Sequence, residues 1–446
     1  MGRRWAAPIL LSLLAACGTS SMDTRQNLPP LEPVPAPAPE PPAPLSDGGE
    51  VRLTTKGRWV RSDWTALPGW QADSVRQAWP ALWRSCERVL NTGLANRPVT
   101  TPARPAAVPT ATTARPDPAA LLNGNGAVPA PAPGYDTASA ALFARHWSPT
   151  CRAVRALGPN ADENTARDFL TSRLQPWRVE SAEGRADGMM TGYFEPLVEA
   201  SRVRSERHAV PLHGVPADLA LRQPWYSRTQ IDTLPEAQAA LAGREIAWVA
   251  DPLEALMLQI QGSGRLVLAP QGPAGERRVV RVAFAAHNGQ PYQSVGRWLV
   301  DQGAFTLEQA SWPAIRQWAR QNPQRVREML QANPRYVFFR EEALPDPNVG
   351  ALGAQGVPLT PGRSIAVDRD SIPYGTPVWL ASTEPQPWSL NPPPARPMQR
   401  LVVAQDTGSA ILGAVRADFF WGWGDGIEDR AGRTKQPLRL WVLWPR

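Results

Sequence analysis

Residues 400–426 read RLVVAQDTGSAILGAVRADFFWGWGDG, and this stretch organises the whole chain. The run 401–404 is apolar without a polar break, which predicts a short strand buried on both faces. Asp406 stands at the exit of that strand, and Asp418 follows twelve residues later beside the aromatic cluster 419–423. Two acids near one turn favour proton-transfer chemistry. The alternative is that both acids accept hydrogen bonds from loop amides and the aromatic rings are core.

A second apolar strand is predicted at residues 189–196, MMTGYFEP, where the proline ends it. Thr191 and Tyr193 are two positions apart, so they share one face of this strand. That face either lines a groove or meets solvent.

Residues 255–268, ALMLQIQGSGRLVL, favour a strand in which Gln259 and Gln261 project from one face. The Gly-Ser-Gly loop after them, with Ser263 and Gly264, lets the backbone approach a ligand closely. Paired amides beside such a loop suit sugar hydroxyls and N-acetyl groups. A solvated strand face with a flexible hairpin is the other interpretation.

A turn is predicted at residues 287–292, HNGQPY, from its Asn-Gly pair. Asn288 and Tyr292 either contact substrate there or only form the turn. The four histidines of the chain show no metal-ligand spacing, so we expect neither a metal nor a cofactor.

The N-terminus has the form of an export signal at residues 1–17, with two arginines and then a short apolar run. Cys17 follows Leu-Ala-Ala and resembles the cysteine of a bacterial lipoprotein box, which implies lipid anchoring and, with Gly18 next, an outer membrane lipoprotein facing the periplasm. Residues 18–59 are predicted to be a tether, because nine of the sixteen residues 29–44 are proline.

Lipidation at Cys17 would leave two further cysteines, Cys86 and Cys151. In an oxidising compartment, these two cysteines are expected to form a disulfide rather than to bind a metal. Between them, residues 97–133 contain nine prolines and no apolar periodicity, which predicts a disordered insertion.

The formal charge of +7 comes from 45 Arg and only 2 Lys, which is weak support for an anionic partner. A carboxylate-bearing cell-wall polymer fits this charge as well as nucleic acid does. Since no dense basic run alternates with aromatic residues, we expect no nucleic-acid binding.

Taken together, these segments resemble the membrane-bound lytic transglycosylase A family of murein-cleaving enzymes. The resemblance rests on motifs that occur in order between about residues 190 and 422: TGY at 191–193, QIQGSG at 259–264, NG with PY at 288–292, NPRYVFFR at 333–340, AVD with IP at 366–373, and AQDTG at 404–408 through Gly422. Position 409 is Ser where the family usually has Gly.

The resemblance implies a mainly β fold with flanking helices, in which a groove separates a double-psi β-barrel domain from a smaller inserted β-barrel domain. On this chain the barrel domain would comprise residues 60–197, with N-terminal helices, and residues 338–446. The inserted domain would be residues 198–337.

The resemblance also implies roles for residues. Asp418 matches the family's catalytic aspartate, and Asp406 and Asp368 match the supporting acids. A structural role for these two supporting acids is slightly favoured, with Asp406 the second choice for the acid. Groove-lining positions fall on Thr191, Tyr193, Gln259, Gln261 and Ser263.

The implied activity is lytic transglycosylation of peptidoglycan glycan strands, acting from chain ends, with cell-wall synthesis proteins as conceivable partners. Asp418 would have to be protonated near neutral pH, so its pKa should be raised by the surroundings of Phe419 and Phe420 and by the charge of Asp406. Two alternatives stay open: a hydrolase that uses both acids, and a non-catalytic wall-binding lipoprotein.

Overall fold

The computed structural model describes residues 49–92, 137–270, 278–307, 309–344, 346–386, 393–408 and 410–446. The predicted signal segment with Cys17, residues 18–48 of the predicted tether and the Pro-rich insertion 97–133 lie outside these residues. The tether prediction is wrong for its last part, because residues 51–53 and 57–59 are strand and pair into a sheet. Among the described residues, none of the helices combines the length and the apolar character needed to cross a bilayer.

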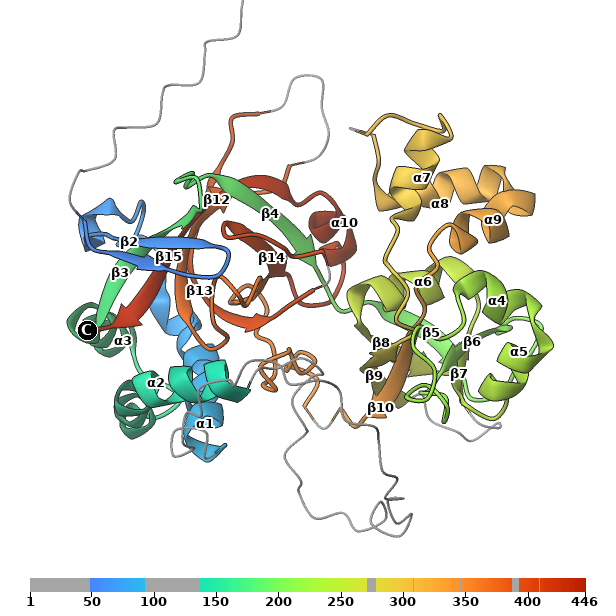
Figure 1. Ribbon diagram of the computed structural model, residues 1–446, viewed down its shortest axis with the longest axis horizontal. Helices are drawn as coiled ribbons and strands as arrows, with labels where there is room; N and C mark the ends of the chain where they lie inside the picture. The colour runs from blue at the N-terminus through green and yellow to red at the C-terminus, as the bar shows by residue number, and fades with distance from the viewer. Residues whose placement is uncertain are drawn as a thin grey trace, which may run out of the picture. The chain divides into compact units, whose positions relative to one another are not determined.

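The predicted buried strand lies at the centre of the larger of two sheets. It is β13 (Pro397–Asp406), and residues 401–405 are fully buried. The sheet has nine strands in the order β1-β2-β3-β15-β12-β13-β11-β14-β4 (Figure 1). The other strands are β1 (Val51–Leu53), β2 (Gly57–Arg61), β3 (Leu174–Ser181), β4 (Gly188–Tyr193), β11 (Ser364–Val367), β12 (Pro377–Thr383), β14 (Arg416–Phe420) and β15 (Lys435–Pro445).

Six of these strands close into a barrel. The long strand β15 pairs with β12 through residues 439–442 and with β4 through residues 435–438, so the ladder returns to its starting strand. A closed barrel leaves no free strand edge. Mainly β architecture with flanking helices is therefore confirmed.

The second sheet forms between β4 and β11 in the sequence. Its six strands run in the order β10-β9-β8-β5-β7-β6, and among the described ladders β10 and β6 are its two ends. The strands are β5 (Leu197–Ser201), β6 (Val210–His213), β7 (Glu245–Val249), β8 (Ser263–Leu268), β9 (Arg278–His287) and β10 (Val337–Glu342). A buried hydrogen bond of 2.8 Å between His213 Nδ1 and the hydroxyl of Tyr336 joins the two ends.

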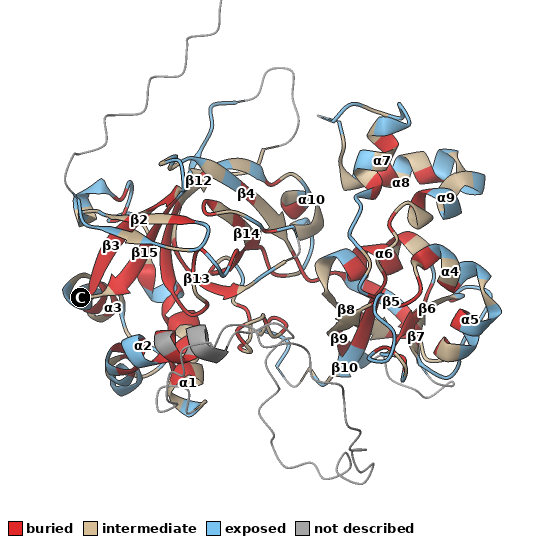
Figure 2. Cartoon of the chain, in the orientation of Figure 1, coloured by how far each residue is buried: buried red, intermediate tan, exposed pale blue. Residues whose placement is uncertain are grey.

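Helices accompany this second sheet, and α6, α7, α8 and α9 share a small apolar core of their own. They are α4 (Arg228–Thr233), α5 (Pro235–Leu241), α6 (Pro252–Gln261), α7 (Val295–Asp301), α8 (Trp312–Gln321) and α9 (Val326–Gln331). Leu253 and Leu256 of α6 pack with Leu299 of α7 and Met329 of α9. Figure 2 shows the buried sides of these helices turned inward and their outer sides exposed.

The residues 255–261 are helical, so the predicted strand is wrong there. Asp251 caps α6 by accepting a hydrogen bond from the amide of Leu253, Pro252 occupies the first turn, and Gly262 ends the helix in a left-handed conformation. Strand structure begins only at Ser263. In a helix, residues two apart point in different directions, so Gln259 and Gln261 do not share a face.

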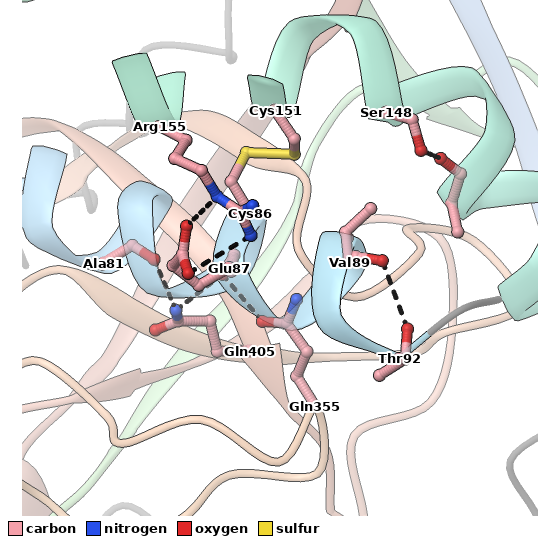
Figure 3. Close-up of a disulfide and its surroundings, with 12 residues drawn as sticks. Ala81, Cys86, Glu87, Val89, Thr92, Ser148, Cys151, Arg155, Gln355 and Gln405 are labelled. Atoms are coloured by element: carbon pink, nitrogen blue, oxygen red, sulfur yellow. Dashed lines mark hydrogen bonds and ion pairs between the residues drawn. A yellow bond between two sulfur atoms is a disulfide. The ribbon is translucent and has the colours of Figure 1, made fainter. Parts of the chain in front are cut away.

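The predicted disulfide is present between Cys86 and Cys151, as Figure 3 shows. It joins α1 (Trp79–Asn91) to α2 (Thr137–Leu157), and α3 (Glu163–Arg173) follows. Beside it, Ser85 donates to Gln355 and accepts from Gln405, the residue before Asp406. The disulfide-linked helix thus contacts the strand that carries one of the two candidate acids.

Candidate active site

A row of cross-strand partners brings the two candidate acids together. Ala366 of β11 lies opposite Asp406 of β13 on one side and opposite Asp418 of β14 on the other. Asp418 in turn lies opposite Thr191 of β4. Directly paired residues project from the same face of a sheet, so one face presents both carboxyl groups with Thr191 beside them.

Alternation along the strands separates this face from the core. On β14, Ala417 and Phe419 are completely buried on the opposite face, whereas Asp418 is only half-buried. The expectation that Phe419 surrounds the acid is therefore wrong. Phe420 closes the end of the acid-bearing face, where its ring lies 5.1 Å from that of Tyr193.

Thr191 and Arg416 form a directed chain of hydrogen bonds to the candidate acid. Thr191 Oγ1 donates to Asp418 Oδ1 at 2.6 Å, and Arg416 Nη2 donates to Thr191 Oγ1 at 2.8 Å. Because the hydroxyl hydrogen of Thr191 is directed at Oδ1, a proton on the carboxyl group belongs on Oδ2. The strand face that Thr191 and Tyr193 share is therefore the face next to the two acids. The sequence alone did not decide whether this face lines a groove or meets solvent.

The environment of Asp418 favours its protonated form. Burial raises the pKa of Asp418 to about 6, and the negative charge of Asp406 adds to this, whereas the Thr191 hydrogen bond and the Arg416 charge act in the opposite direction. Burial also raises the pKa of Asp406, against hydrogen bonds from the amides of Ala354 and Thr407 and from Tyr193.

Both carboxylate oxygens of Asp406 accept hydrogen bonds from other groups of the protein. Its Oδ1 accepts from the amide of Ala354 at 2.9 Å, and its Oδ2 accepts from the hydroxyl of Tyr193 at 2.9 Å. Asp368 is 6 % exposed, and its two oxygens accept from the amides of Asp370 and Gly413. Both acids thus hold loop backbone in place, which agrees with the structural role favoured from the sequence.

The other predicted site residues divide into several groups. Asn288 is completely buried, with its amide donating to the carbonyls of Tyr226 and Pro334, so a substrate contact by Asn288 is excluded. Tyr292 is 38 % exposed and remains a candidate.

The QIQGSG segment is divided between the end of helix α6 and the start of strand β8, so its two glutamines do not project from one strand face. Gln261 accepts from the amide of Phe194, directly after β4, while Gln259 is buried and accepts from Arg228. Gly264 is buried too, because a Cβ there would meet Leu258 Cδ2 at 2.1 Å, so it serves packing. Ser263 is half-buried at the start of β8 and remains a candidate.

The sequence and the structure are similar to those of known proteins, and these similarities show which family the chain belongs to. Residues 189–340 match the model of the MltA specific insert domain, and residues 363–444 match the model of the 3D domain. A solved lytic transglycosylase, LtgG, of Burkholderia pseudomallei is 38 % identical, with 89 % of this chain and 97 % of that chain covered and a TM-score of 0.53. The chain belongs to the membrane-bound lytic murein transglycosylase A family.

MltA of Escherichia coli carries the family's name and matches both in sequence and as a solved structure. Membrane-bound lytic murein transglycosylase A of Escherichia coli K12 is 29 % identical over 335 residues, which are 73 % of this chain and 86 % of the relative. The solved structure of Escherichia coli MltA with bound chitohexaose is 28 % identical, covers 67 % of this chain and 83 % of that chain, and has a TM-score of 0.55. These relatives confirm the family resemblance predicted from the sequence motifs.

Sequence reasoning missed Arg416 as a site residue. It stands two positions before Asp418 on the same strand, so strand alternation alone places both on one face. Glu195 was another omission: it is buried between Arg265 and Arg281, where the chain passes from β4 to β5. Both arginines also donate to the carbonyl of Val349, in the segment that connects β10 of the second sheet to β11 of the larger sheet.

Proposed function

We propose that this chain is a lytic transglycosylase that cleaves the β-1,4 bond between N-acetylmuramic acid and N-acetylglucosamine in peptidoglycan and leaves 1,6-anhydromuramoyl ends. Family membership supports the reaction class, because the relatives are named lytic murein transglycosylases. The observation that carries the mechanism is the hydrogen bond from Thr191 to Oδ1 of Asp418, which leaves Oδ2 to carry a proton.

In the first step, Asp418 acts as the acid. Its Oδ2 proton passes to the oxygen of the glycosidic bond while the bond from that oxygen to the muramoyl anomeric carbon breaks. With a pKa of about 6 for Asp418, roughly one molecule in ten carries this proton at pH 7. An aspartate with an ordinary pKa would be protonated about a hundred times more rarely.

In the second step, the same carboxylate acts as the base. It takes the proton of the C6 hydroxyl of the muramoyl residue, and the C6 oxygen bonds to the anomeric carbon to close the anhydro ring. Asp418 is then protonated again, so the cycle needs neither a water nor a second acid. The attacking hydroxyl belongs to the sugar itself, which supplies the proximity that a bound water would otherwise need.

The engagement of Asp406 argues against the two-acid hydrolase. In a retaining or inverting glycosidase, the second carboxylate must reach the substrate or a water. Both oxygens of Asp406 instead accept hydrogen bonds from the protein, namely from Ala354 and Tyr193. A purely wall-binding lipoprotein, for its part, would not need a carboxyl group whose pKa is raised.

The test is Asp418→Asn assayed on purified sacculi, with Asp168→Asn on the exposed face of α3 as the matched control. We expect Asp418→Asn to abolish release of anhydromuropeptides while sacculus binding persists, and Asp168→Asn to behave as the wild type. Mass spectrometry of the wild-type products distinguishes the reactions: reducing ends without anhydro ends would establish the hydrolase. Unchanged lysis by Asp418→Asn would move the acid to Asp406.

We further infer that the chain is anchored to the outer membrane through lipidated Cys17 and faces the periplasm. The apolar run before Cys17 and the membrane-bound name of the relatives support this anchor. Replacement of Cys17 by Ser should move the protein from the membrane fraction to the soluble fraction. Action from chain ends and recruitment by cell-wall synthesis proteins stay predictions of the family resemblance.

A further inference from the structure

A cavity of about 1160 Å³ lies in the part of the chain that forms the second sheet, away from the row of acids. Its walls come from β6, α4, α5, α6, α8 and α9 and from neighbouring loops. A volume of this size accommodates a short peptide or a comparable ligand. The catalytic scheme above makes no use of it.

Several of the buried side chains that line the cavity are polar. Four of its lining side chains are buried to more than nine-tenths: Arg228, Gln259, His213 and Tyr336. Buried polar groups of this kind are costly unless they bind one another or a ligand. Arg228 donates to Gln259, and His213 Nδ1 hydrogen-bonds the hydroxyl of Tyr336, so these side chains form a polar cluster in the cavity lining.

Arg228 has hydrogen-bonding capacity left over for a ligand. Its Nε donates to the carbonyl of Asn333, and its Nη2 donates to Gln259 and to the carbonyl of Arg335. Within the described residues, Nη1 has no acceptor and Arg228 forms no ion pair with a carboxylate, although Nη1 is not sealed from solvent. The amide nitrogen of Gln259 also has no acceptor there. Arg228 Nη1 and the Gln259 amide nitrogen are hydrogen-bond donors only, so a ligand that binds them must supply acceptor atoms.

The exposed charged residues that line the cavity are also mainly positive. Arg204 and Arg320 are exposed lining residues without a carboxylate partner in the described part of the chain. Of the lining acids, Asp232 lies 3.9 Å from Arg327, which leaves Asp251 and Glu245 against Arg204, Arg228 and Arg320. The unpaired charge is therefore mainly positive and favours an anionic ligand.

Two contacts link elements that line the cavity to segments next to the catalytic strands. Gln261, two residues after Gln259 in α6, binds the amide of Phe194 next to Tyr193. Arg316 lines the cavity and pairs at 3.1 Å with Glu428 of α10 (Ile427–Gly432), which follows β14 in the sequence. An extended tripeptide spans about 10 Å, so a peptide attached to a bound glycan extends well beyond the sugar that carries it.

We propose that this cavity binds the carboxylate-bearing peptide stem of the peptidoglycan strand, with Arg228 and Gln259 receiving a carboxylate and Arg204 and Arg320 guiding it. The choice of a peptide stem rests on the proposed function, because peptidoglycan carries such stems on its muramoyl residues. The stem site adds affinity for peptide-bearing strands and takes no part in the proton transfers at Asp418.

Calorimetry with the stem tripeptide released from sacculi tests this site directly. The double variant Arg204→Gln/Arg320→Gln changes only exposed side chains and so preserves the fold; Arg297→Gln on α7, outside the cavity, is the matched control. We expect the wild type and the control to bind the tripeptide, and the double variant to bind it about tenfold more weakly. Amidation of the peptide's carboxyl groups should weaken binding to the wild type at least as much.

Kinetics on two substrates separate the stem site from the catalytic one. The double variant should raise KM for peptide-bearing strands and leave KM for amidase-stripped strands unchanged. Equal binding of the amidated peptide, or an unchanged affinity of the double variant, would overturn the proposal. So would inorganic phosphate binding in the cavity without any binding of the tripeptide. Failure of the proposed function would appear separately, as absence of anhydro ends while the tripeptide still binds.

Discussion

Thr191 Oγ1 lies 2.6 Å from Asp418 Oδ1 across two neighbouring parallel strands, although 227 positions separate the two residues in the chain. The hydroxyl donates to one oxygen of the acid and leaves the other to hold a proton. Arg416 donates to the same hydroxyl from the other side. The protonation state of Asp418 therefore depends on side chains from two strands that come together only in the closed barrel.

Thr191→Val should shift the pH dependence of cleavage upward. The Thr191 hydrogen bond lowers the pKa of Asp418, so its loss raises that pKa further above about 6. We expect the midpoint of the falling limb of the pH–rate profile to rise by about half to one unit. Thr191→Ser retains the hydroxyl and should keep the wild-type midpoint. A downward shift in Thr191→Val would contradict this role.

Asp406→Asn should move the same midpoint in the opposite direction. The negative charge of Asp406 raises the pKa of Asp418, so its removal lowers that pKa and leaves less of the acid protonated at neutral pH. Tyr193→Phe removes a hydrogen bond to Asp406 but keeps the charge, and it serves as the control. An equal downward shift in both variants would mean that loss of the hydrogen bond between Tyr193 and Asp406, and not loss of the Asp406 charge, lowers the pKa of Asp418.

Asp418→Asn should stabilise the fold at neutral pH. Because the folded pKa of Asp418 is raised to about 6 from an unfolded value near 4, the folded state binds more protons between these values, and stability falls as pH rises through this window. We expect the variant to gain about 1 to 3 kcal/mol in unfolding free energy at pH 7.5 and much less at pH 4. Urea unfolding at the two pH values measures this, and equal gains at both would contradict it.

Removal of the disulfide should weaken the fold. The bridge between Cys86 and Cys151 spans 65 positions, and closing such a loop stabilises by about 4 kcal/mol in the chain-entropy model. Replacing both cysteines by Ser should lower the unfolding free energy by about that amount. A reducing agent should lower the unfolding free energy of the wild type to nearly that of the variant. Identical unfolding curves with and without the bridge would show that it carries no stability.

The sequence by itself determined the features that depend on local pattern. The apolar run 401–404 gave the buried strand, and alternation placed Thr191 and Tyr193 on one face. Both follow from spacing along one strand, which neighbours far away in the chain do not alter. The catalytic role of Asp418 was implied by the family resemblance and not by spacing.

Local pattern misassigned residues 255–261, because a short apolar run fits a buried helix as well as a strand. Asp251-Pro252 before the run and Gly262 after it are helix start and stop signals that favour the helix. With the helix in place, Gln259 turns to Arg228 and Gln261 turns to the backbone after β4.

Only the tertiary structure decided which side chains meet. Asp406, Ala366, Asp418 and Thr191 form one row because β13, β11, β14 and β4 pair in that register, and register depends on the closure of the barrel by β15. The raised pKa of Asp418 has the same origin, since burial and the nearby charge of Asp406 exist only after distant strands have packed together.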